Sequence, residues 1–128
     1  MRALVDTHAL LWFVLDDERL GPEARRTMRA GANDLLFSIG SCWEFAVKCG
    51  LGKISLGKPF DQSLWHELRT NRIALLAIGP EHLNALATLE HHHRDPFDRL
   101  LVAQAPAENV PLLSRDERLD AYGVKRVW

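Results

Sequence analysis

The segment RDPFDRLLVAQA, residues 94–105, contains the signals of a helix start. Asp95 stands at the N-cap position, Pro96 at the first helical position and Asp98 three residues after the cap. The apolar run that follows predicts a helix, which Pro106 should end or kink. Capping alone would explain both carboxylates, because acidic side chains in a first turn accept hydrogen bonds from free backbone N–H groups.

The composition is that of a soluble globular protein with one domain, residues 1–128. The chain is 47% hydrophobic and 26% charged, and it is long enough to bury a single core. Its 16 basic and 17 acidic residues give a formal charge of −1. Nucleic-acid-binding proteins usually have a basic excess, so any binding of this kind must use a local patch.

The chain ends and the cysteines predict a cytoplasmic protein with no membrane partner. Met1 and Arg2 lead directly into a strand-like segment without the apolar region of a signal peptide, and no apolar run could span a bilayer. Cys42 and Cys49 lie about 10.5 Å apart along a predicted helix, which is too far for a disulfide. We therefore expect both to be reduced.

Strand-like apolar runs alternate with helical segments along the chain. Strands are predicted at residues 3–5, 34–38, 74–78, 110–113 and 125–127, and helices are predicted between them. Because crossovers between parallel strands are right-handed, this order predicts an α/β fold. We expect a central parallel sheet of about four to five short strands with helices on both faces.

Four acidic residues occupy positions that this fold would bring toward one end of the sheet. Asp6 and Asp116 end predicted strands, at the edge where open parallel sheets bind ligands. Glu44 lies in a helix just after a strand, and Asp98 begins the helix that leads to the strand before Asp116. A cap at Asp6 or Thr7 explains the first of these positions equally well.

Glu44 gives the strongest indication of a functional role, because its helix is otherwise almost entirely apolar. The polar stripe of that helix consists of Ser41, Glu44 and Lys48. An ion pair between Glu44 and Lys48 would be a sufficient structural explanation. Burial of a charge is costly unless the charge is paired or binds a metal, and this favours function.

Four carboxylates in one cleft would repel one another, so the cluster requires a cation. Oxygen ligands select a hard ion, Mg²⁺ or Mn²⁺. The main use of such a site is phosphoryl chemistry with a metal-activated water. The sequence lacks a Gly-rich phosphate loop, so hydrolysis of a phosphodiester is favoured over hydrolysis of a nucleoside triphosphate.

Other polar residues near the carboxylates in sequence are assigned supporting roles. Thr7 and Ser114 are candidates to hold the ligands or a bound water by hydrogen bonds, and Asp95 is assigned to the helix cap beside the site. Five basic residues are candidates to contact a nucleic-acid backbone: Arg94, Arg99, Lys48, Lys53 and Arg115.

Three further motifs are assigned structural roles. Asp61 is predicted to cap the amphipathic helix that follows it. The three consecutive histidines at 91–93 converge on one ion less easily than spaced ligands do, so we interpret them as a polar loop. The arginines at 25, 26 and 29 are interpreted as a solvated helix face, with a phosphate-binding patch as the alternative.

The pattern resembles the PIN-domain ribonucleases, and within them the VapC toxins of bacterial and archaeal toxin–antitoxin pairs. The similar segments follow the order of the family along the whole chain: LVDTHALLW at 4–12, SCWEFAVK at 41–48, HHRDPFDRLLVAQA at 92–105, LSRD at 113–116 and AYGV at 121–124. The sequence departs from the family at Pro106, which interrupts a usually longer helix, and at Cys42 and Phe45, which replace aliphatic residues. These departures affect packing rather than the carboxylates.

The resemblance implies that Asp6, Glu44, Asp98 and Asp116 form a metal-binding cluster within a PIN-like domain. It also implies endonucleolytic cleavage of RNA that depends on Mg²⁺ or Mn²⁺. The implied partners are a second copy of the chain, in a homodimer, and a VapB-like antitoxin whose C-terminal segment covers the active site.

Three other functions share some of these features. A phosphorylatable receiver domain is disfavoured, because Asp6 is followed by Thr7 instead of a second acidic residue and no lysine stands in the required place. A non-catalytic binding module is disfavoured by the intact set of four carboxylates. A housekeeping RNA-processing nuclease of the same fold remains open.

Overall fold

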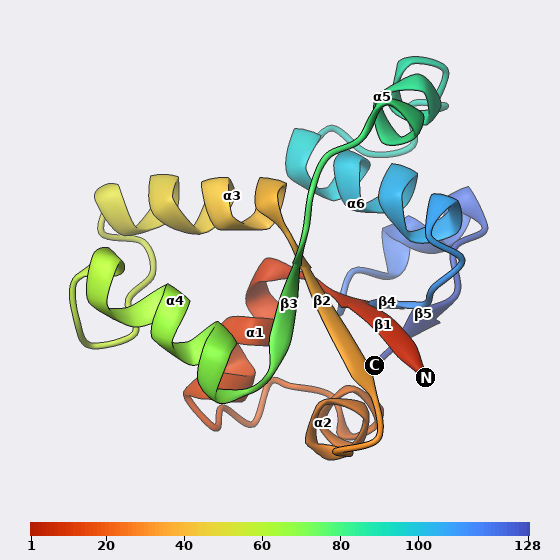
Figure 1. Ribbon diagram of the computed structural model, residues 1–128. Coiled ribbons are helices and arrows are strands. Elements are labelled where there is room, and N and C mark those ends of the chain that lie inside the picture. The colour runs from red at the N-terminus through yellow and green to blue at the C-terminus, as the bar shows by residue number, and fades with distance from the viewer.

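Five parallel strands form one sheet in the order β3-β2-β1-β4-β5 in the computed structural model, which describes residues 1–128 (Figure 1). Every neighbouring pair of strands is parallel. The strands are β1 (Arg2–Val5), β2 (Asp34–Ser38), β3 (Ile73–Leu76), β4 (Leu112–Leu113) and β5 (Arg126–Val127). The predicted α/β class, with a parallel sheet of four to five strands, is confirmed.

Helices connect the successive strands. Between β1 and β2 lie α1 (Thr7–Val14) and α2 (Pro22–Arg29), and between β2 and β3 lie α3 (Ile39–Gly50) and α4 (Phe60–Thr70). The connection from β3 to β4 contains α5 (Pro80–Ala87) and α6 (Pro96–Ala107), and a 3₁₀ helix, η1 (Glu117–Tyr122), precedes β5. None of the helices is long and apolar enough to cross a membrane.

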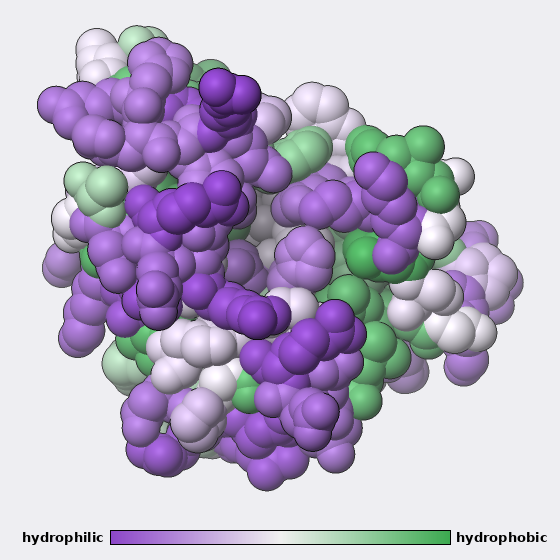
Figure 2. Space-filling model, turned by 180° about the vertical axis from the view of Figure 1, so that it is seen from behind, coloured by the Kyte–Doolittle hydropathy of each residue, from purple (hydrophilic) through white to green (hydrophobic).

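The core lies on both faces of the sheet because alternate strand residues point in opposite directions. Val5, Phe37 and Leu113 belong to a cluster with buried residues of α1, α2, α3 and α4. Leu4 and Leu112 belong to a second cluster, with residues of α6 and η1. Helices therefore cover both faces, as predicted, while the outer surface seen in Figure 2 is mostly hydrophilic.

One predicted element end is wrong. Helix α6 continues to Ala107, one residue beyond Pro106, so Pro106 lies inside the last turn, where its missing N–H removes one intrahelical hydrogen bond. Strand β4 ends at Leu113, as predicted. A local turn follows it, because the backbone N–H of Asp116 donates to Ser114 Oγ at 3.2 Å.

The predicted cap at Asp61 is also wrong. Helix α4 begins at Phe60 with Pro59 at the N-cap position, and no side chain caps it. Asp61 therefore lies within the first turn, where its negative charge still suits the helix dipole.

The parallel arrangement determines where the site lies. Chain segments that leave the carboxyl ends of β1, β2 and β4 pass into α1, α3 and η1, respectively. Since parallel strands end at the same edge, the beginnings of these three helices lie at one edge of the sheet. The predicted acidic residues are found at this edge.

Truncation of the α6 core residue Leu101, by Leu101→Ala, should lower the free energy of unfolding by about 2–5 kcal/mol, because it leaves a cavity against the sheet. Leu101 is 1% exposed, whereas Leu83 on α5 is 52% exposed. Leu83→Ala is the matched control and should change stability by less than about 0.5 kcal/mol. Urea unfolding measures both, and equal losses would contradict the assignment of Leu101 to the core.

Candidate metal centre

Asp6 lies at the end of β1 and serves as the N-cap of α1. Its Oδ1 accepts a hydrogen bond from the Ala9 backbone N–H at 2.7 Å. The pKa of Asp6 is raised to about 6, mainly by burial and also by the charges of Glu44 and Asp116, while the Ala9 and Ser114 hydrogen bonds offset part of the increase. The cap uses one carboxylate oxygen, so the capping role leaves the other oxygen for a ligand.

Asp98 lies in the first turn of α6, and no hydrogen bond reaches its carboxylate. The imidazole of His93 lies nearby, with Nε2 3.5 Å from Asp98 Oδ2. Burial raises the pKa of Asp98 to about 7, with further contributions from the charges of Asp95, Asp6 and Glu44. Asp95 itself caps α6 as predicted, accepting from the backbone N–H groups of Phe97 and Asp98.

Glu44 is buried on α3 and has a partner for each oxygen. Thr7 Oγ1 donates to Oε1, and Lys48 Nζ lies 2.6 Å from Oε2. The predicted ion pair within the helix is therefore present, and Thr7 supports a carboxylate as expected. These contacts hold the start of α1 against α3.

Asp116 caps η1 and accepts more hydrogen bonds than the other three acidic residues. It accepts from the backbone N–H and the guanidinium of Arg118 and from His93 Nε2. The Arg118 hydrogen bonds are the main reason why the pKa of Asp116 lies well below its usual range. Asp116 is thus ionised and already neutralised by a cation of the chain.

The four predicted residues therefore form one cluster with two kinds of members. Glu44 and Asp116 have the cationic partners Lys48 and Arg118, whereas Asp6 and Asp98 have no lysine or arginine partner and have raised pKa values. Desolvated carboxylates without a counter-ion are stabilised by a bound cation. An all-oxygen donor set fits Mg²⁺ or Mn²⁺, which Asp6 and Asp98 would hold with the other two carboxylates beside them.

His93 is the residue that sequence reasoning missed. Its Nε2 lies 3.5 Å from Asp98 Oδ2 and 2.8 Å from Asp116 Oδ2. Nδ1 accepts from the Asp95 backbone N–H at 3.0 Å, so Nε2 carries the proton and donates to Asp116 Oδ2 at 2.8 Å. In this tautomer His93 orients a carboxylate and is not a metal ligand. The only available signal was its place two residues before the α6 N-cap.

The predicted RNA contacts fall into two groups. Arg94, Lys53 and Arg115 are exposed, and Lys48 is partly buried against Glu44. Arg99 is buried, and its guanidinium donates to the carbonyls of residues 89 and 90 and to the Tyr122 hydroxyl. The charge of Arg99 thus fixes the loop before α6, and its role as an RNA contact stays a prediction.

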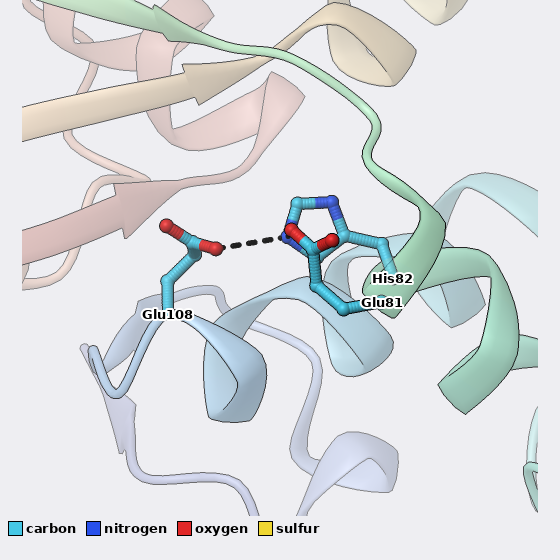
Figure 3. A group of neighbouring side chains, drawn as sticks. All are labelled: Glu81, His82 and Glu108. Atoms are coloured by element: carbon cyan, nitrogen blue, oxygen red, sulfur yellow. Dashed lines mark hydrogen bonds and ion pairs between the residues drawn. The ribbon is translucent and has the colours of Figure 1, made fainter.

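A second acidic cluster, formed by Glu81, His82 and Glu108, has a structural explanation (Figure 3). His82 is buried, and its Nδ1 accepts from the Gly79 backbone N–H at 2.9 Å. Its Nε2 therefore carries the proton and donates to Glu108 at 3.0 Å. A metal would need the lone pair that this proton occupies, so the cluster fastens α5 to the end of α6.

Comparisons with known proteins agree with this architecture. The chain is similar in structure to VapBC2 from Rickettsia felis bound to a promoter DNA fragment, with TM-score 0.70, 14% identity and 100% coverage of both chains. It is also similar to VapBC-1 from nontypeable Haemophilus influenzae, with TM-score 0.69, 16% identity and coverage of 98% and 96%. A third similar structure is FitAB bound to an IR36 DNA fragment, with TM-score 0.64, 15% identity and coverage of 97% of this chain and 92% of that chain. At these identities the likeness establishes the shared fold alone.

The sequence matches no curated protein directly. The profile of the PIN domain family, however, matches residues 3–125, a range that contains all four carboxylates of the cluster. Together with the five-stranded parallel sheet, this match shows that the chain belongs to the PIN domain family.

Proposed function

We propose that this protein is a metal-dependent endoribonuclease and the toxin of a VapBC-type toxin–antitoxin pair. The observation that carries the proposal is that Asp6 and Asp98, two desolvated carboxylates without a lysine or arginine partner, lie at the carboxyl edge of a PIN-domain sheet, near enough for the charge of Asp6 to raise the pKa of Asp98. The similarity to VapBC complexes supports the toxin assignment. With RNA as the substrate, we expect the protein to act in the cytoplasm.

The chain contributes positioning and charge to the proposed hydrolysis. A bound Mg²⁺ or Mn²⁺ would supply a water of lowered pKa and offset charge on the phosphate. Asp6 and Asp98 would hold this ion. Thr7 and Lys48 fix the orientation of Glu44, and His93 fixes that of Asp116.

Three exposed basic residues would place the substrate. Arg94, Lys53 and Arg115 lie on the surface, where cations attract the phosphates of a nucleic acid without reading its sequence. Because the overall charge is −1, binding of RNA would depend on such individual surface cations.

Helix α3 carries a feature that supports protein partners. Ile39, Trp43, Val47 and Leu51 are exposed and recur every four residues, so they form one apolar stripe along α3 and its C-cap. A contiguous exposed apolar stripe is typical of an interaction surface. We propose that the protein forms a homodimer and binds a VapB-like antitoxin.

Asp98→Asn should reduce metal-dependent RNA cleavage by at least about a hundredfold while leaving the fold intact, because it removes charge from the proposed metal site. The assay is cleavage of a panel of structured RNAs with Mg²⁺, with Mn²⁺ and with EDTA. Asp61→Asn, outside the cluster, is the control and should retain activity. Wild-type cleavage by Asp98→Asn would disprove the assignment.

The stabilisation of the protein by Mg²⁺ should depend on pH. The pKa values of Asp6 and Asp98, about 6 and about 7, exceed the ordinary value of 3.8. The folded state thus binds protons more tightly than the unfolded chain. The free energy of unfolding of the metal-free protein should therefore rise as pH falls from about 8 to about 5. Mg²⁺ competes with these protons.

Thermal unfolding with and without MgCl₂ tests this linkage. The increase in Tm caused by Mg²⁺ should be larger at pH of about 8 than at about 5.5, where both carboxyls are protonated. Asp61→Asn should show the wild-type pH dependence. The same increase at both pH values would rule out these two carboxyls as the metal site.

Light scattering of the purified chain should give twice its 14.5 kDa mass, as a homodimer requires. A Val47→Lys variant should be monomeric if the α3 stripe forms the dimer contact, because the substitution buries an unpaired charge. Glu67→Lys, on α4, is the control for added positive charge. A monomeric wild type would contradict the homodimer, and absence of any co-purifying antitoxin from the native source would favour a housekeeping nuclease.

A further inference from the structure

Every lone-pair position of the Asp116 carboxylate is occupied. Oδ1 accepts from the backbone N–H and the Nε–H of Arg118, at 3.0 and 2.9 Å. Oδ2 accepts from Arg118 Nη2 and from His93 Nε2, both at 2.8 Å. A carboxylate offers about four lone-pair sites. A divalent cation can therefore bind Asp116 only if one of these donors leaves.

Arg118 is the donor that can leave. His93 is buried, and the Asp95 backbone N–H holds its ring in place at 3.0 Å. The Arg118 side chain is 72% exposed, and its guanidinium donates only to Asp116. Exposed ion pairs contribute little free energy, so the guanidinium can turn away from Asp116 at small cost.

A basic cavity lies next to Arg118. It has a volume of about 1140 Å³, and Arg118 lines it together with His91, His92 and Arg94. A guanidinium binds a phosphate with two parallel hydrogen bonds, in the same geometry with which it binds a carboxylate. A phosphate in this cavity would thus offer Arg118 a partner equivalent to the one it gives up.

We propose that Arg118 is a positioning residue that neutralises Asp116 in the absence of a divalent cation and transfers to an RNA phosphate when cation and substrate bind. This inference rests on the proposed function, because it takes the acidic cluster as the metal site. It assigns Arg118 two successive partners. The chain thereby protects a buried carboxylate cluster from its own repulsion and releases Asp116 when the substrate arrives.

The sequence contains a natural control for this arrangement. Asp17-Glu18-Arg19-Leu20 repeats the tetrapeptide Asp116-Glu117-Arg118-Leu119. Arg19 holds Asp17 with the same three donors, at 2.9, 3.1 and 2.7 Å, and both aspartate side chains are 22% exposed. Only Asp116 also contacts a buried histidine and lies within reach of a second carboxylate, Asp98. Arg19→Gln therefore removes a similar ion pair that involves none of the four cluster carboxylates, together with a contact of Arg19 over the Trp12 ring.

Calorimetric titration of the RNA-free protein with MgCl₂ and MnCl₂ tests the competition. Arg118→Gln should tighten the Kd about two- to fivefold, as loss of a competing exposed ion pair predicts. Arg19→Gln should leave the Kd unchanged. In the Asp116→Asn background, Arg118→Gln should give no gain, because the carboxylate for which the two cations compete is absent.

Two measurements follow the Arg118 side chain itself. In NMR spectra of the wild-type protein, MgCl₂ should shift the Arg118 Nε–H resonance and speed its exchange, while the Arg19 Nε–H resonance stays unchanged. Inorganic phosphate should bind the Mg²⁺-loaded wild type at least about threefold more tightly than Arg118→Gln, because a guanidinium pairs with phosphate.

The outcomes distinguish failure of the proposed role of Arg118 from failure of the proposed metal site. Equal metal affinity of the wild type and Arg118→Gln, or a gain that persists with Asp116→Asn, overturns the role of Arg118 alone. The role of Arg118 is also overturned if MgCl₂ does not shift the Arg118 Nε–H resonance, or if the wild type and Arg118→Gln bind phosphate equally well. Failure of both the wild type and Arg118→Gln to bind any divalent cation overturns the proposed metal site, and the inference with it.

Discussion

Repulsion among buried carboxylates is the constraint on which the rest of the site depends. Parallel strands bring Asp6, Glu44, Asp98 and Asp116 to one edge of the sheet, where desolvation and their mutual charges act together. The chain neutralises two of the four, through Lys48 and Arg118, and leaves Asp6 and Asp98 without a lysine or arginine partner. The negative charge that remains on Asp6 and Asp98 favours binding of a hard divalent cation at this edge.

Helix capping and the functional site are compatible explanations of the same residues. Asp6, Asp95 and Asp116 each cap a helix that begins at or beside this edge, and a cap hydrogen bond of this kind occupies only part of a carboxylate. Capping also fixes the side chain, because the N–H groups of the first turn hold it in one orientation. A strand followed by a capping aspartate and a helix thus both builds the fold and aims an oxygen into the site.

Several predictions could be made from the sequence because they depend on local signals. The alternation of strands and helices, the Asp95 cap and the Glu44–Lys48 pair all follow from spacing within one segment. The predicted cap at Asp61 was wrong, and the role of Arg99 as a structural residue was not foreseen. Pro59 occupies the cap position ahead of Asp61, and Arg99 turns inward to bind carbonyls that lie 9 and 10 residues away.

The sequence by itself determined which carboxylates are present, the order of strands and helices, and therefore the edge at which those carboxylates meet. Periodicity and helix-start signals carry this information because they act over a few residues. Only the tertiary structure decided that His93 lies against both Asp116 and Asp98, and that no lysine or arginine pairs with Asp98. The contacts that join His93 and Asp116 span 23 residues of sequence, and such pairings depend on how α6 and β4 pack rather than on any local pattern.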